Sequence, residues 1–392
     1  MFPNTKYEKF EKIEESKGSL DKDSDEDKLM RSVMNNDKKM IDDGKLISEA
    51  MNQSIGTFNP DLMFQSIVDN YKLAKDIYGE KLIRQISGYE PEYIDRNKKI
   101  PEFQDELKKN ISAKTSQLRK DGLIDKENSM TEKAISLSSL IMYMEELDKL
   151  KLYGIDGKND NLVKNRINKK GDVLPYKKGN SYKDINVRST IKTAIRRNHS
   201  TLQLEDLKID EKDSKGKIKI IYGLDASASM KGKKIEMAKK AGIALSYKAC
   251  QDRNEVGLIV FGDEIKEELL PTNNFNLILD KITRVKPSKQ TNIARTIQRA
   301  YEMLDSKTST KHLIIITDAL PTFGDDPIKE TLEECYKAQK HNISTSIIGI
   351  NLDKEGILTS EKIVEAGNGR LHLVKDLEKI DILILEEYQR LR

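Results

Sequence analysis

The chain has 392 residues, of which 37% are hydrophobic and 34% charged, a balance that allows sizeable cores beneath a densely charged surface. Its net charge of +4 is too small by itself to indicate nucleic-acid binding. The two cysteines, Cys250 and Cys335, exclude a disulfide framework and a C-x-x-C site. The N-terminus lacks the apolar segment of a signal peptide, and the apolar runs are too short to span a bilayer. We therefore expect a cytoplasmic protein of two or three domains.

Residues 1–57 predict a disordered, charged tail. They contain 13 acidic and 10 basic residues and few aromatic ones. Such a composition buries too little apolar surface to offset the entropy lost on ordering. Within this tail we expect only a short helix near Leu46 to Met51.

Residues 58–155 predict a helical domain. Asn59 is a good N-cap, Pro60 suits the first helical position, and apolar residues then recur at helical spacing as far as Ile86. Two further helices are expected at 102–120 and 131–150.

The segment between these two helices has a Gly122-Leu123-Ile124 turn, a polar excursion and a Thr131 cap. This order also occurs in winged-helix DNA-binding domains. The alternative is a helical packing layer without a role in nucleic-acid binding, and the sequence favours it.

Residues 156–216 predict a basic loop, a helix over 187–197 and a charged linker. Between positions 164 and 197 there are 11 Lys or Arg residues against 2 Asp. Arg188, Arg196 and Arg197 are candidates for binding acidic surface or phosphate, because the planar guanidinium group makes paired contacts with such groups. The alternative is a solvated basic helix, since exposed charges usually contribute little.

Residues 217–392 predict a second domain in which strands and helices alternate. The expected strands are 218–224, 256–261, 265–270, 312–317, 344–350 and 371–374, and the expected helices are 233–249, 293–304, 328–340, 363–366 and 377–391. Alternation of this kind is typical of a mostly parallel sheet with helices on both faces, that is, an α/β doubly wound fold. Ligands of such folds bind outside the carboxyl ends of the strands.

Oxygen-bearing side chains follow these strand ends. Asp225, Ser227 and Ser229 form an Asp-x-Ser-x-Ser motif after the first strand, Asp318 follows a later strand, and Thr291 precedes a helix between them. Two carboxylates with hydroxyls, and no thiol or imidazole, are ligands that suit a hard cation such as Mg²⁺.

The segment from Asp225 to Ala241 resembles the first metal motif of von Willebrand factor A domains, and Thr291 and Thr317-Asp318 resemble the second and third. The resemblance covers roughly residues 217–392. It implies a Rossmann-like sheet with one antiparallel edge strand and a metal-ion-dependent adhesion site (MIDAS). It also implies that Asp225, Ser227, Ser229, Thr291 and Asp318 bind Mg²⁺ or Mn²⁺, and that a partner's Asp or Glu carboxylate fills the open coordination position. Ala228 and Ala319 stand where the family usually has Gly, which should affect backbone freedom rather than ligation.

The basic segment from Asp184 to Arg197 resembles the stretch before the A domain in prokaryotic CoxE-like proteins, relatives of the chelatase D subunits. Those proteins work with MoxR-type AAA+ ATPases. The resemblance implies an intracellular, chaperone-like adaptor in metal-cofactor insertion or complex maturation. Nucleic-acid binding through the winged-helix-like segment and the 164–197 patch is the alternative.

Catalysis is not expected. The chain has no Walker A sequence and no G-x-S-x-G elbow, and Ser227 stands where haloacid dehalogenase-type phosphatases need a second aspartate. Its four histidines are scattered along the chain. The strand-end site therefore indicates recognition rather than an enzyme.

Overall fold

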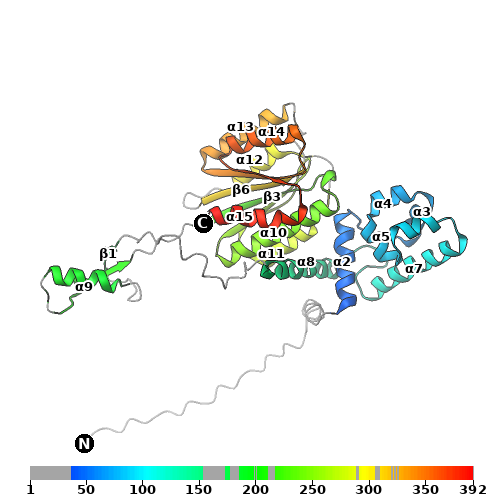
Figure 1. Ribbon diagram of the computed structural model, residues 1–392, viewed down its shortest axis with the longest axis horizontal. Coiled ribbons are helices and arrows are strands. Elements are labelled where there is room, and N and C mark those ends of the chain that lie inside the picture. Colours follow the sequence, from blue (N-terminus) through cyan, green and yellow to red (C-terminus); the bar gives the residue numbers. More distant parts are fainter. Residues whose placement is uncertain are drawn as a thin grey trace, which may run out of the picture.

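A computed structural model describes residues 37–152, 173–176, 185–197, 199, 201–210, 217–287, 291–304, 310–318, 321, 324 and 326–391. In chain order these residues form a helical domain, a small α/β unit and a sheet domain (Figure 1). No helix within the described ranges is long and apolar enough to cross a membrane.

The helical domain is built around one hydrophobic core. Its helices are α2 (Lys38–Asn52), α3 (Pro60–Asp69), α4 (Tyr71–Tyr78), α5 (Glu80–Ser87), α6 (Pro91–Asn97), α7 (Pro101–Lys120) and α8 (Glu132–Leu152). Each of them contributes to the core, in which Ile47, Phe58 and Ile111 are completely buried.

The expected charged tail is shorter than residues 1–57, because α2 belongs to this core. Asp37 caps α2 by accepting a hydrogen bond from the amide of Lys39 at 3.1 Å. The acidic Asp43 is buried and forms an ion pair with Lys114 at 2.6 Å, so part of the charge counted as solvated is paired inside the domain. Residues 1–36 lie outside the described part of the chain.

The single helix expected between Pro60 and Ile86 is divided into α3, α4 and α5. Asn70 ends α3 and caps α4, accepting a hydrogen bond from the amide of Leu73 at 3.1 Å. Gly79 separates α4 from α5 with a φ of 77°, which other residues rarely adopt. Apolar periodicity continues through both breaks, which is why spacing alone did not reveal them.

The segment between α7 and α8 closes the helical core. Leu123 and Ile124 are buried in that core, and the Thr131 hydroxyl donates a hydrogen bond to the Gly122 carbonyl at 2.8 Å. Ile124 and Met130 form an isolated antiparallel bridge. The described residues of this segment thus pair through single bridges, without the strand ribbon that would form a wing.

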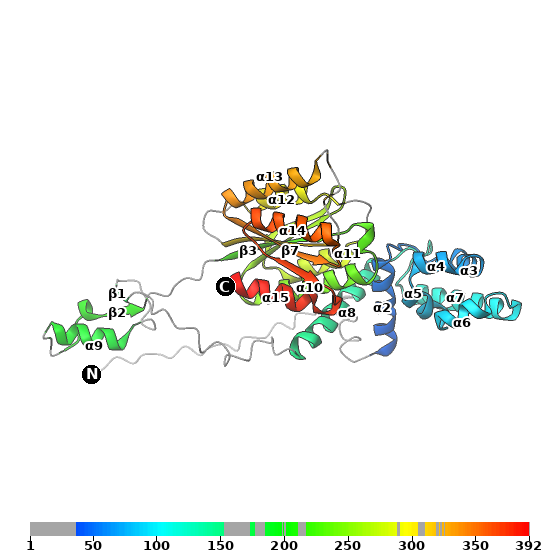
Figure 2. The same cartoon turned by 45° about the horizontal axis from the view of Figure 1, so that its top comes forward.

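The small unit pairs β1 (Val173–Pro175) with β2 (Lys208–Asp210) in antiparallel fashion. Helix α9 (Val187–Arg196) packs against β2, and the 3₁₀ turn η2 (Leu204–Asp206) packs against α9. Figures 1 and 2 both show the unit apart from the sheet domain.

The sheet domain contains a mixed sheet of strand order β5-β4-β3-β6-β7-β8. Its strands are β3 (Ile218–Asp225), β4 (Glu255–Phe261), β5 (Ile265–Thr272), β6 (Thr310–Thr317), β7 (Ile343–Ile350) and β8 (Leu371–Val374). Only the edge pair β4–β5 is antiparallel. The expected doubly wound, mostly parallel sheet with one antiparallel edge strand is confirmed.

Helices cover both faces of this sheet. They are α10 (Lys233–Gln251), α11 (Phe275–Arg284), α12 (Ile293–Met303), α13 (Pro327–Lys340), α14 (Lys354–Ala366) and α15 (Ile380–Leu391). Tyr222 of β3 lies in the core beneath α10, α11 and α15, whereas its neighbour Ile221 lies in the core beneath α12, α13 and α14. This alternation is what a strand buried on both faces requires.

Helix α8 joins the two domains, because it packs on α2 in the helical domain and on α10 and α11 in the sheet domain (Figure 2). Near its start Glu132 pairs with Arg284 of α11 at 2.5 Å, and near its end Lys149 pairs with Asp381 of α15 at 2.7 Å. The helical domain is therefore fixed against the α10 face of the sheet.

Candidate metal site

Two carboxylates meet at the carboxyl edge of the sheet. Asp225 is the last residue of β3, and Asp318 directly follows β6, the parallel neighbour of β3. Leu224 and Ile316 are register partners, so the two strands end side by side. The topology also switches at this point, since β4 lies on the other side of β3.

Hydrogen bonds link four of the five predicted ligand residues. Asp225 accepts the amide of Ser227 through Oδ1 at 2.8 Å. The hydroxyls of Ser227 and Ser229 lie 3.0 Å apart. Ser229 Oγ then donates to Asp318 Oδ1 at 2.7 Å. The residues of the motif therefore do converge, through the Ser227 amide and the two serine hydroxyls.

Thr317, at the end of β6, also contributes to the site. Its hydroxyl donates a hydrogen bond to Asp225 Oδ2 at 2.6 Å. Each carboxylate oxygen of Asp225 thus accepts a hydrogen bond, one from a backbone amide and one from a hydroxyl, and these two bonds fix the orientation of the carboxylate. Sequence reasoning used Thr317 only as part of the third motif and assigned it no role.

Thr291, the fifth predicted ligand residue, lies at the same edge. The amide of the next residue, Asn292, donates to the carbonyl of Gly262 at 2.7 Å, and Gly262 directly follows β4. Asn292 also caps α12 by accepting the amide of Arg295 at 3.0 Å. Thr291 itself is only 2% exposed. A strand end and a helix start thus hold Thr291 in a buried position beside β4.

The site has excess negative charge in a buried place. Burial raises the pKa of Asp225 to about 6; the hydrogen bonds from Thr317 and Ser227 act in the opposite direction, and the charge of Asp318 adds to the rise. One cation is present, because Lys234 Nζ lies 2.5 Å from Asp318 Oδ2. A second, divalent cation would offset the charge of both carboxylates.

The donor set fits Mg²⁺ or Mn²⁺ and not a soft metal. Among the described residues no group of three or more His, Cys, Asp or Glu side chains is arranged to hold a metal. Here two carboxylates and the hydroxyls of Ser227, Ser229 and Thr291 provide oxygen only, the ligand type that hard cations prefer. Ala228 lies in the 3₁₀ turn η3 (Ala228–Met230) and has no positive φ, so glycine is not needed there.

The helical domain holds the loop that carries the first motif. Lys231 Nζ donates to the carbonyls of Asp76 and Ile77, at the end of α4, at 3.1 and 3.0 Å. The amide of Gly232 donates to the carbonyl of Asn52, at the end of α2, at 3.0 Å. Two helix ends therefore fix the residues that directly follow Met230. No local sequence pattern predicts this contact.

A buried lysine strengthens this junction. Lys239 of α10 is 1% exposed and donates to Asn52 Oδ1 at 3.0 Å and to the Thr283 carbonyl at 3.1 Å. Burial lowers the pKa of Lys239 to about 7.

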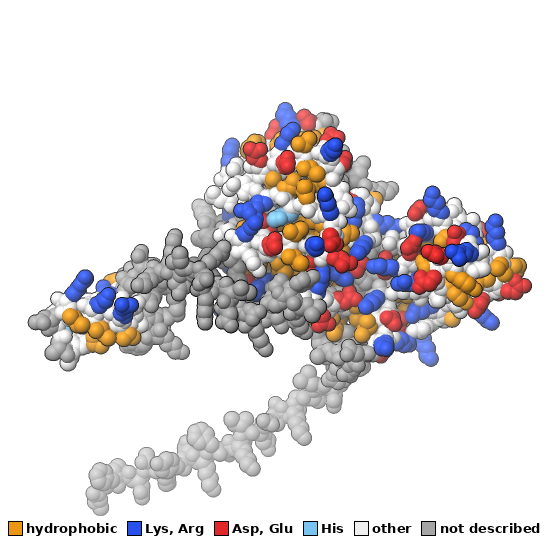
Figure 3. Space-filling view, in the orientation of Figure 1, with side chains coloured by type: hydrophobic (Ala, Val, Ile, Leu, Met, Phe, Trp, Pro, Cys, Tyr) orange, Lys and Arg blue, Asp and Glu red, His pale blue; other side chains and the backbone are white. Residues whose placement is uncertain are grey.

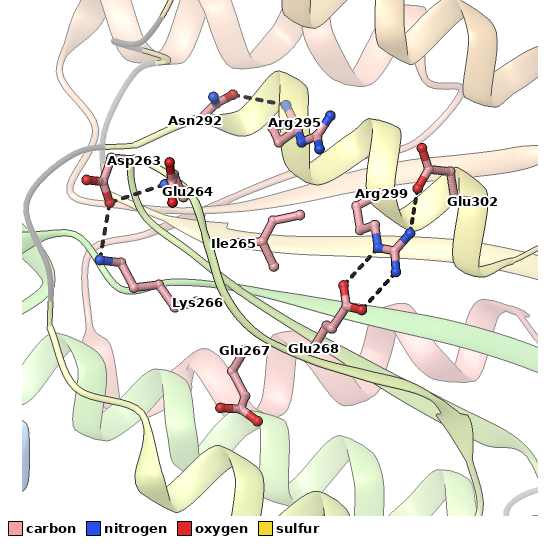
Figure 4. Close-up of a pocket in the computed structure, with 10 residues that line it drawn as sticks. All are labelled: Asp263, Glu264, Ile265, Lys266, Glu267, Glu268, Asn292, Arg295, Arg299 and Glu302. Carbon is pink, nitrogen blue, oxygen red and sulfur yellow. Dashed lines mark hydrogen bonds and ion pairs between the residues drawn. The ribbon is translucent and has the colours of Figure 1, made fainter.

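A shallow groove begins at Asn292, the residue after Thr291, and runs between β5 and α12 (Figure 4). Its volume is about 850 Å³. Arg299 binds both oxygens of Glu268 at 2.8 Å and also binds Glu302 at 2.6 Å, while Ile265 points into the middle of the groove. The groove is thus lined by charged side chains, most of which are paired with one another.

The three candidate partner-binding arginines lie on the small unit and not at the metal edge. Arg197 binds Asp206 Oδ1 at 3.2 Å and the Glu205 carbonyl at 2.9 Å, which ties the end of α9 to η2. Arg188 and Arg196 are exposed on α9.

All four histidines have structural surroundings away from the metal edge. His312 and His372 lie 3.4 and 3.0 Å from the two oxygens of the buried Glu387. His199 binds Asp206 at 2.8 Å, and His341 packs on the ring of Tyr301. The pairing of two histidines on one glutamate could not be foreseen, because β6, which carries His312, is far from β8 and α15 in the sequence.

Comparisons with known proteins agree with this fold. Residues 220–320 match the family model described as the von Willebrand factor type A domain, a range that includes all five predicted ligands. The chain is 27% identical over 124 residues to uncharacterized protein MJ0910 of Methanocaldococcus jannaschii, covering 30% of this chain and 71% of that protein.

The solved structures that are similar to part of this chain include the following two. One is the conserved hypothetical protein BatB from Bacteroides thetaiotaomicron, at 21% identity and a TM-score of 0.38, covering 44% of this chain and 98% of that one. The other is proximal thread matrix protein 1 from the mussel byssus, with a zinc-occupied MIDAS motif, at 17% identity and a TM-score of 0.37, covering 44% and 47%. The family match and the observed sheet together identify a von Willebrand factor type A domain in the C-terminal part of the chain.

Proposed function

We propose that this protein is an intracellular adaptor that binds a partner protein through a divalent cation. Asp225, Ser227, Ser229, Thr291 and Asp318 would hold Mg²⁺ or Mn²⁺ at the carboxyl edge of the sheet. The cation would supply an open position for an Asp or Glu carboxylate of the partner. The observation that supports this most strongly is the hydrogen-bonded series from Asp225 through the two serines to Asp318 at a strand switch point, in which the Ser227 amide makes the first link and side-chain oxygens make the others.

Recognition fits this arrangement better than catalysis does. A serine nucleophile needs an adjacent base, usually a histidine that a third group orients. Here each histidine contacts a side chain away from the metal edge, and the Ser229 hydroxyl donates a hydrogen bond to Asp318. The groove between β5 and α12 begins next to Thr291, so it lies where residues beside the bound carboxylate would extend.

The partner we propose is a MoxR-type AAA+ ATPase or its client, in metal-cofactor insertion or complex maturation. Support comes from the resemblance of residues 184–197 to the stretch before the A domain in CoxE-like proteins. The described part of that stretch forms α9, which carries exposed basic side chains suited to an acidic surface.

Binding of nucleic acid is the second candidate, and the exposed Arg188 and Arg196 favour it. It predicts an affinity that falls by about 0.9 log units per log unit of salt for every phosphate neutralised. Titration of the full chain with labelled duplex DNA and RNA at two salt concentrations tests it. Absence of binding at low salt would eliminate this candidate.

The experiment for the proposed function is affinity capture of the cognate ATPase by the full chain. It is run with Mg²⁺, with chelator, with Asp225→Ala in Mg²⁺, and with Asp95→Asn as a matched control. Asp95 is a half-exposed aspartate of α6 that pairs with Lys98 and lies outside both the metal motif and the groove. We expect retention only for wild type and Asp95→Asn in Mg²⁺. Equal retention in all four arms, or in none, would contradict the proposal.

A further inference from the structure

An exposed apolar row runs along α9. Val187, Ile191 and Ile195 follow one another at four-residue spacing and therefore share a face of the helix. Their side chains are 64, 45 and 70% exposed. Leu202 and Leu204, between α9 and β2, are 59 and 69% exposed. Five of the 15 large apolar residues that are exposed in the described structure thus gather in this one small unit, a concentration that indicates an interaction surface.

The opposite face of α9 packs against the rest of the small unit. Thr190 and Ala194 are buried, and Thr190 Oγ1 accepts the amide of Lys208, in β2, at 2.9 Å. Asn186 caps the helix by accepting the amide of Ser189 at 2.8 Å. The β1–β2 pair therefore fixes the rotation of α9, and the apolar row points away from it.

A basic row lies directly beside the apolar row. Arg188, Lys192 and Arg196 repeat the same four-residue spacing one position later, which places them about 100° further round the helix. All three are exposed. Figure 3 shows this pattern on the small unit, where hydrophobic side chains form a band with Lys and Arg next to it. Asp206, the buried acid of the unit, is already bound by Arg197 and His199.

We propose that this face of α9 binds an acidic amphipathic helix of a partner protein. The partner's apolar side chains would cover Val187, Ile191 and Ile195, and its Asp or Glu residues would pair with the adjacent basic row. Three anchors at helical spacing are the usual footprint of one helix packed against another. Guanidinium groups bind carboxylates through paired hydrogen bonds, so the basic row selects for acidic residues at matching spacing.

Two other occupants fit the surface less well. A second copy of the chain would bring two identical basic rows together, and like charges oppose that contact. A membrane surface is a poorer match, because the exposed row is short, aliphatic and mostly β-branched, without the Trp or Phe that helices lying in the membrane interface present.

The test uses the full chain with a photo-crosslinking residue in place of Ile191, expressed in its native host. The cross-linked peptide is identified by sequencing. We expect one segment of another protein, with apolar residues at helical spacing flanked by Asp or Glu. Cross-links to lipid, to a second copy, to the chain's own acidic residues 21–27, to a segment without that pattern, or no cross-link would each overturn the proposal.

A charge variant makes the test specific. With the cross-linker at Ile195, Arg188→Glu combined with Lys192→Glu should lower the yield at least fivefold, whereas Lys120→Glu on the exposed end of α7 should not. Circular dichroism and thermal unfolding show whether the variants remain folded. An unchanged yield in the double variant would overturn the proposal. The inference rests on the proposed function in taking α9 as a surface for a partner protein. The surface contains no residue of the metal site and the assay no metal-dependent step, so a failure here is distinguishable from a failure of metal-dependent binding.

Discussion

Lys234 places its ammonium 2.5 Å from Oδ2 of Asp318, whose other oxygen accepts the hydrogen bond from Ser229. The carboxylate that we propose to face a divalent cation is thus already paired with a monovalent one. Two unit charges about 4 Å apart interact by about 4 kcal/mol at an effective dielectric constant of about 20. The lysine therefore stabilises the metal-free site and opposes the bound metal.

Replacing Lys234 by methionine should raise the affinity for Mg²⁺. Removal of the competing ammonium leaves both carboxylates to the metal, and we expect about a tenfold gain, which corresponds to about 1.4 kcal/mol. Isothermal titration calorimetry of the full chain with Mg²⁺ measures this affinity. Lys233→Met is the matched control, because Lys233 pairs with Glu378 instead. An unchanged or weaker Mg²⁺ affinity in Lys234→Met would show that the lysine does not compete.

The backbone at Gly232 should be sensitive to any side chain. Gly232 has φ 78° and ψ −129°, and an added Cβ would lie 3.1 Å from the Gln53 amide nitrogen. Gly88 is a matched control with the same φ but ψ 3° and a nearest neighbour at 4.0 Å. We expect Gly88→Ala to cost about 1 kcal/mol and Gly232→Ala about 2–3 kcal/mol in urea unfolding. Equal costs would mean that the contact between Gly232 and the helical domain contributes little.

Lys239 should make stability rise with pH. Its folded-state pKa of about 7 lies below its ordinary value of 10.5, so between these values the unfolded chain binds more protons than the folded one. The cost of burying its charge is largest below pH 7 and is relieved as pH approaches 10.5. The free energy of unfolding of wild type minus that of Lys239→Met should increase by a few kcal/mol between about pH 6.5 and 9.5. A difference in free energy of unfolding that stays constant or falls as the pH rises would contradict the lowered pKa of Lys239.

Glu387 should make stability fall in acid. Burial alone would raise its pKa, but hydrogen bonds from His312, His372 and Ser346 hold it well below the ordinary value of 4.5. The carboxylate therefore stabilises the fold above pH 4.5, and this contribution is lost as pH falls toward the folded-state pKa. We expect Glu387→Gln to cost roughly 3 kcal/mol at pH 7, because it breaks a buried charged cluster.

The same pair of proteins shows whether that loss is electrostatic. The difference in free energy of unfolding between wild type and Glu387→Gln should shrink steadily below pH 4.5. Glu386→Gln, an exposed neighbour on α15, controls for the loss of one acidic residue. A difference that does not depend on pH would assign the effect of Glu387→Gln to packing.

Local patterns predicted the sheet and the meeting of Asp225, Ser227 and Ser229 with Asp318, because both depend on short stretches of sequence. Strand β3 is a continuous apolar run that ends in Asp225, and the spacing of Ser227 and Ser229 fixes where their hydroxyls go. Helix α11 was missed because it has only 10 residues, so that its apolar spacing, as at Ile278 and Ile282, gives a short signal.

What could not be predicted depends on contacts between distant segments. Lys239 has the pattern of a surface lysine on an amphipathic helix, yet Asn52, 187 residues away, covers it. Helix α2 lies in a stretch whose overall charge indicated disorder, and its apolar face becomes visible only when α8 packs on it. Burial of a side chain by another domain cannot be predicted from the residues next to it in the sequence.

The most direct test of the central claim is Mn²⁺ binding to the full chain, followed by electron paramagnetic resonance. Wild type, Asp225→Asn, Ser229→Ala and the control Asp263→Asn are compared in the absence of any partner. The account predicts one Mn²⁺ ion per chain for wild type and Asp263→Asn, displaced by excess Mg²⁺. It predicts no binding by Asp225→Asn and at least tenfold weaker binding by Ser229→Ala, because each loses a ligand. Mn²⁺ binding that is absent from wild type, or equal in all four proteins, would contradict it.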